Sequence, residues 1–164
     1  MFGLALFAIL AAATVPPLTT ALNRSRAHGA ARFVVSRMVL ARYQAVSRGA
    51  VTALRVTRVG SDTVLATFVD GNRNGVLAAD IAAGIDTPQG RATSLTGEFP
   101  GVVVAPLDQD GAAFSFSPLG TSSSGTLYLS GRDGTRFAVR VVGATGRARV
   151  LRYVAATDSW ADAQ

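Results

Sequence analysis

Hydrophobic and polar residues divide the chain into two parts with different periodicities. Residues 1–22 contain no charged side chain, and only the pair Pro16-Pro17 disturbs their apolar run. After Asn23, apolar residues recur at alternating steps of four and three, the spacing of one face of an α-helix. This stripe consists of Ala27, Ala31, Val34, Met38, Ala41 and Ala45. The pattern predicts an apolar helix over 1–22 and an amphipathic helix over 23–49 that stops at Gly49 and packs on the rest of the chain.

Residues 50–164 change to the short, alternating segments that are typical of β-strands. We expect strands at 51–57, 63–69, 102–105, 113–117, 126–130, 136–142 and 147–153. Glycine-containing turns separate them, and no spacing suits a parallel βαβ unit, so the sheets are expected to be antiparallel. The predicted fold class is α+β, with a long N-terminal helix packed on an antiparallel β-rich head over 50–164.

Charge is distributed as unevenly as hydropathy. All sixteen basic residues are arginine; residues 1–58 hold eight of them and no acid, whereas 59–164 hold eight arginines and ten acids. A basic helix that follows an apolar segment fits an anionic membrane surface or acidic faces of neighbouring subunits, with a solvated face as the plain alternative. We expect Arg24, Arg26 and Arg32 at such an interface.

The apolar start predicts a permanent membrane anchor. Residues 1–15 give about 22 Å of helix, somewhat short for a bilayer core of about 30 Å. A cleaved secretory signal is the alternative, but no basic stretch precedes the apolar run, and no clean small-x-small cleavage site followed by a mature start is visible.

Residues 5–18, followed by the arginine-rich helix, resemble the N-terminus of type IV pilins and type II secretion pseudopilins. In that family a cleavage glycine, an N-methylated residue and a glutamate precede the apolar run. Alignment on Pro16 places Met1 just after that glutamate, so we expect the native chain to begin a few residues upstream. In the head, the segments 41–55, 68–75, 114–120, 125–129 and 145–149 resemble the GspH/FimT branch of minor pseudopilins.

This resemblance implies a pilin-like fold and a single-pass protein of the bacterial inner membrane with its head in the periplasm. The implied function is a minor pseudopilin, a structural subunit at the tip of a type II secretion pseudopilus that acts in protein secretion. The implied partners are other pseudopilins or pilins through their N-terminal helices, inner-membrane lipid and secreted substrate proteins. The expected membrane and filament packing residues are Phe2, Leu4, Leu6, Phe7, Ile9, Leu10, Val15, Pro16, Leu18 and Leu22.

The last predicted strand supports an alternative function. Alternation places Arg147 and Arg149 on one side of it, and Arg152 adds a third candidate contact for DNA or another anion. A Gly-Arg-x-Arg element at 146–149 also resembles one that FimT-like proteins use in DNA uptake. The alternative is therefore a FimT-like minor type IV pilin that binds DNA.

The loop after Asp70 copies the first half of an EF-hand calcium loop, with oxygen ligands at Asp70, Asn72 and Asn74. The twelfth position is Ile81 rather than a carboxylate, so we expect a turn braced by its own side chains, with weak calcium binding as the alternative.

Other site chemistry finds little support. The chain has one histidine, His28, and no cysteine, which leaves no evident catalytic triad or zinc site. We expect no enzyme and no cofactor; a membrane-tethered hydrolase is the remaining, weakly supported alternative.

Overall fold

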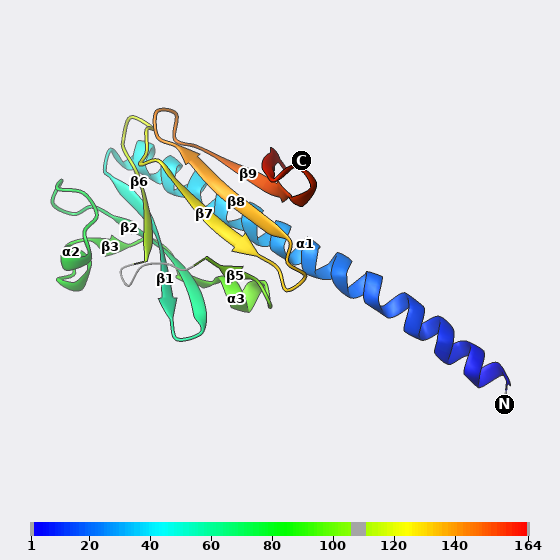
Figure 1. Cartoon of the computed structure of the whole chain (residues 1–164). Helices are drawn as coiled ribbons and strands as arrows, with labels where there is room; N and C mark the ends of the chain where they lie inside the picture. Colours follow the sequence, from blue (N-terminus) through cyan, green and yellow to red (C-terminus); the bar gives the residue numbers. More distant parts are fainter. Residues whose placement is uncertain (1, 106–110, 164) are drawn as a thin grey trace.

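The computed structural model describes residues 2–105 and 111–163, and it describes side chains from Thr19 on. A long helix, α1, packs on two antiparallel sheets and continues beyond them as a rod (Figure 1). α1 spans Phe2–Arg48 and runs through the Pro16-Pro17 pair. It stops at Gly49, as predicted, because Gly49 has a φ of 64°, which is accessible to glycine at little cost.

The first sheet, sheet A, is built on a hairpin of β1 (Thr52–Val59) and β2 (Asp62–Val69). β6 (Ala112–Phe116) pairs with the free edge of β1. Two short strands, β3 (Thr87–Pro88) and β4 (Thr93–Ser94), pair with β2. The strand order is β3-β2-β1-β6 with β4 beside β2.

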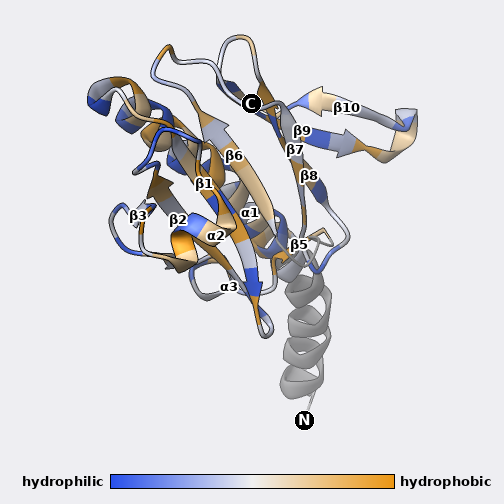
Figure 2. Cartoon of the chain, turned by 90° about the vertical axis from the view of Figure 1, so that its left-hand side faces the viewer, coloured by the Kyte–Doolittle hydropathy of each residue, from blue (hydrophilic) through white to orange (hydrophobic). Residues whose placement is uncertain are grey.

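The second sheet, sheet B, has the order β10-β9-β8-β7-β5. Its strands are β5 (Val103–Val104), β7 (Gly125–Ser130), β8 (Arg136–Val142), β9 (Arg147–Val154) and β10 (Ser159–Asp162). β9 and β10 form a hairpin that projects at one edge of the sheet (Figure 2).

All seven expected strands are present, with ends that differ by at most two residues. The elements missed from the sequence are β3, β4, β10, the helices α2 (Ala78–Ala82) and α3 (Leu95–Glu98), and the 3₁₀ helix η1 (Ala155–Thr157). Each of these is five residues long or shorter, too short for a hydrophobic period to identify it. The mixed helical and antiparallel architecture is confirmed.

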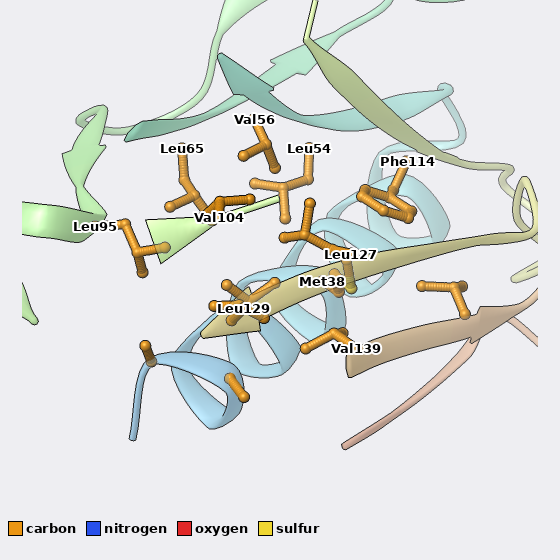
Figure 3. Close-up of a cluster of buried hydrophobic side chains, with 14 of the residues drawn as sticks. Met38, Leu54, Val56, Leu65, Leu95, Val104, Phe114, Leu127, Leu129 and Val139 are labelled. Carbon is orange, nitrogen blue, oxygen red and sulfur yellow. The ribbon is translucent and has the colours of Figure 1, made fainter. Parts of the chain in front are cut away.

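The core forms where α1 meets both sheets. All six residues of the predicted helix stripe are fully buried, so the prediction that this stripe packs on the head is confirmed. Side chains from sheet A and sheet B, among them Leu54, Leu127 and Val139, close over Met38 (Figure 3). Alanine at four of the six stripe positions allows the strands to approach the helix closely.

Among the residues whose side chains are described, no helix combines the length and the apolar character that a membrane crossing requires.

Candidate functional site

The outer side of α1 carries an exposed apolar patch. Val39, Leu40, Tyr43 and Val46 are 58%, 42%, 69% and 52% exposed. Steps of three and four residues bring them together on the helix surface, away from the buried stripe. We call these four residues the α1 patch. The sequence contains a signal for this patch, since its four residues recur at helical spacing, but the longer stripe that faces the head dominates the pattern.

The expected packing residues from Phe2 to Leu18 have side chains outside the described part of the structure. Leu22, the last of them, is described and is 48% exposed. It lies on the stretch of α1 that precedes Ala27, which from Thr19 onward is the first residue that the head buries completely. The same stretch and the following turns expose Arg24, Arg26 and Arg32 to solvent.

The structure separates the three candidate arginines of β9. Arg147 and Arg149 are exposed on the outer face of sheet B, and Arg149 pairs in register with Arg140 of β8. Arg152 pairs with Phe137, which is only 2% exposed, so Arg152 lies on the opposite, inner face of the strand. The three side chains therefore do not form one site.

An aromatic cluster shares the outer face of sheet B. The ring of Trp160 lies 5.5 Å from that of Tyr128 and 5.4 Å from that of Tyr153. The Arg136 guanidinium carbon lies 5.3 Å from the centre of the Tyr153 ring, at cation–π distance. The Tyr153 hydroxyl donates a hydrogen bond of 2.5 Å to Asp158, and this bond is the main reason that the pKa of Tyr153 is raised.

On the inner side, Arg152 lines a groove of about 620 Å³ between α1 and the end of β9. We call it the stalk groove; its lining is Ala21, Arg24, Ser25, His28, Phe137, Arg152, Asp162 and Ala163. The ring of His28 stacks on that of Phe137 at a centroid distance of 5.3 Å. Desolvation, followed by the charges of Arg32 and Arg24, lowers the pKa of His28.

The Asp70 loop is braced from within by buried carboxylates. Asp70 is 7% exposed and accepts backbone N–H groups of Asn72, Arg73 and Gly75 at 3.0, 2.7 and 2.8 Å. Asp86 is 1% exposed and accepts the backbone N–H groups of Gly71 and Leu77 at 3.0 and 2.9 Å.

The two asparagines of this loop turn their amide nitrogens toward Asp80. Asn72 Nδ2 and Asn74 Nδ2 donate to Asp80 Oδ2 at 3.1 and 2.8 Å. In the described part of the chain, no three acidic or histidine side chains are grouped so that they could hold a metal ion. The side chains brace the turn as expected, and weak calcium binding stays the alternative prediction.

Two comparisons place this architecture among known proteins. The model of a family described as type II transport protein GspH matches residues 30–146. Among solved structures, the minor pseudopilin EpsH from the type 2 secretion system of Vibrio cholerae matches with a TM-score of 0.54 and 15% sequence identity. This match covers 77% of the present chain and 97% of the EpsH chain and shows a shared fold. No curated protein sequence matches.

Proposed function

Because the chain belongs to the GspH family of type II transport proteins, we propose that it is a minor pseudopilin, a structural subunit of a type II secretion pseudopilus. In this role it helps to assemble the filament tip and so takes part in protein secretion. The observation that carries the proposal is the α1 patch, an exposed apolar surface on a helix whose other side the head already fills. An apolar helix face of this kind is suited to packing against helices of other subunits.

The α1 patch is large enough to contribute to assembly. Complete burial of one side chain of the size of valine, leucine or tyrosine is worth about 1.5–3 kcal/mol. Burial of the exposed parts of four such side chains is then worth several kcal/mol before the entropic cost of association is subtracted. A contact of this strength is expected to act together with packing of the preceding apolar segment.

The three parts of the chain have different roles in this proposal. Residues 1–22 anchor the protein in the bacterial inner membrane as a single span and join the helices of other pseudopilins in the filament. Residues 23–49 continue that helix, with Arg24, Arg26 and Arg32 at the membrane surface. Residues 50–164 form a periplasmic head that contacts secreted substrate proteins. The family assignment and the extension of α1 beyond the head support this arrangement.

Cross-linking through an introduced thiol tests the proposal. The sequence contains no cysteine, so Tyr43→Cys creates a unique thiol within the α1 patch. With a thiol-to-amine reagent, we expect adducts to other pseudopilins in cells that assemble the secretion system. Tyr128→Cys is the matched control, because Tyr128 is 44% exposed on the outer face of sheet B, away from α1.

A functional variant complements the cross-link. We expect Tyr43→Glu to leave the head folded, since the side chain is 69% exposed, and to reduce secretion by placing a charge in the helix contact. Equal adducts from the Tyr43→Cys and Tyr128→Cys variants, together with normal secretion by Tyr43→Glu, would refute the proposed helix contact.

A second candidate function is DNA binding as a FimT-like minor type IV pilin during uptake. The outward-facing arginines of β8 and β9 support it, because Arg140, Arg147 and Arg149 share one exposed face with the aromatic cluster. Binding through phosphates falls steeply with salt. We expect a filter assay to retain DNA at low salt only, and the double change Arg147→Gln with Arg149→Gln to weaken retention. Absence of DNA retention at low salt would eliminate this candidate.

A further inference from the structure

We propose that the stalk groove binds the phosphate of an anionic phospholipid headgroup. The inference rests on the proposed membrane insertion of residues 1–22 and adds a defined lipid site to it. Arg24 of α1 and Arg152 of β9 are the two residues that bind the phosphate.

The first argument is the chemistry of the lining. Arg24 and Arg152 come from elements far apart in the sequence and line the same groove. Within residues 19–105 and 111–163, neither side chain has a hydrogen bond or an ion pair that would occupy it. A planar guanidinium presents paired N–H donors that match phosphate oxygens, and two of them suit a phosphodiester better than a single cation does.

The second argument is the charge around the site. Asp162 of β10 is the one acidic residue among the lining residues described, so two arginines leave the groove positive while His28 is neutral. The same two arginines also line an adjoining hollow of about 550 Å³, together with Arg136 and Asp133. The pair therefore stands between two solvent-accessible depressions and is open to a ligand from either side.

The third argument is position. Residues 21–28 of α1 line the groove, directly at the end of the apolar segment that stops at Leu22. Beyond the head, α1 continues toward the N-terminus as a rod (Figure 1). At 1.5 Å per residue, Arg24 follows Leu22 by about 3 Å along the helix axis. If the apolar segment lies in the hydrocarbon, the groove is at headgroup depth, where phosphate is concentrated. Leu22 is 48% exposed and Ala21 lines the groove, so an apolar and a small side chain lie between Arg24 and the preceding segment.

Lipid retention by the full chain tests this proposal. The protein is purified in a neutral detergent, supplied with phosphatidylglycerol or phosphatidylcholine, and examined by native mass spectrometry for bound lipid. We expect phosphatidylglycerol to be retained in preference to phosphatidylcholine. Arg152→Gln should weaken its retention by about tenfold or more, the factor that corresponds to losing one charge-assisted hydrogen bond. Arg149→Gln is the matched control, because Arg149 lies on the same strand and faces the opposite side.

Arg24→Gln provides a second variant that does not depend on the packing of β9, because Arg24 is exposed on α1. It is expected to weaken retention to a similar degree. Circular dichroism of each variant checks that the fold is intact.

Three outcomes overturn the inference. The first is equal retention of the two lipids, and the second is an effect of Arg149→Gln as large as that of Arg152→Gln. The third is displacement of phosphatidylglycerol by millimolar inorganic phosphate, which would assign the groove to a free anion instead of a lipid. Cross-linking of the Tyr43→Cys variant is an independent readout: lost lipid preference with intact cross-links refutes only the lipid site, and the reverse result refutes only the filament contact.

Discussion

Replacement of Asp70 by asparagine tests whether its carboxylate holds the loop between β2 and α2 together. The side chain is 7% exposed, and its two oxygens accept three backbone N–H groups at 2.7–3.0 Å. Asparagine keeps the shape but places an NH₂ group where one oxygen was, so that either Gly75 or the pair Asn72 and Arg73 faces a donor instead of an acceptor. A hydrogen bond to a charged group is worth about 1.5–3 kcal/mol, and an unpaired donor adds a cost of its own. We therefore expect Asp70→Asn to lower the free energy of unfolding by about 2–3 kcal/mol.

The assay is urea unfolding of the full chain in neutral detergent, followed by circular dichroism. Asp80→Asn is the control, since among the described residues this partly exposed carboxylate accepts hydrogen bonds from the side chains of Asn72 and Asn74 alone. Its expected cost is less than about 1 kcal/mol. Equal effects of the two substitutions would contradict the reasoning. Added calcium should not shift the wild-type midpoint; a shift that Asp70→Asn abolishes would show that the loop carboxylates bind the ion.

Three further predictions concern the helix and its contacts. Met38→Ala should lower the free energy of unfolding by about 2–5 kcal/mol, because it leaves a cavity at a fully buried position; urea unfolding measures this, and a change under about 1 kcal/mol would contradict the core assignment. Gly146→Ala should lower the free energy of unfolding strongly, because Gly146 has a φ of 59° and a Cβ there would lie 2.3 Å from the Gly120 carbonyl oxygen. Gly134 has a φ of 80° and open space around it, so Gly134→Ala should cost only the backbone strain. Burial lowers the pKa of His28, so the unfolded chain binds a proton at higher pH than the folded protein does. The free energy of unfolding should therefore keep its full value above the ordinary histidine pKa of about 6.5 and fall as the pH drops below it. His28→Gln should remove this part of the pH dependence in thermal unfolding between about pH 7.5 and 5.5.

The long elements were predictable because each contains enough residues to display a period. The buried stripe from Ala27 to Ala45 and the alternation around Phe137 define which side of α1 and of β8 faces the core. β10 was not predictable, because four residues with a single large apolar side chain, Trp160, do not establish an alternation. It forms because β9 offers a free edge and η1 turns the chain back toward it.

Surfaces were harder to predict than elements. Odd and even positions of a strand face opposite sides, so residue numbers alone place Arg152 on the other face of β9 from Arg147 and Arg149. The stalk groove has no sequence signal of this kind. It exists because sheet B brings β9 against residues 21–28 of α1, more than a hundred residues away in the chain, and only tertiary packing brings Arg24 and Arg152 to one groove.

The alanine stripe of α1 sets a limit on how this protein can be shortened for biochemistry. Deletion of residues 1–49 would remove the helix that covers Leu54, Leu127 and Val139. These apolar side chains would then be exposed to water, so the isolated strands should aggregate. A soluble fragment that begins between Thr19 and Asn23 would omit most of the apolar N-terminal segment and keep every buried residue from Ala27 to Ala45 that packs on the two sheets.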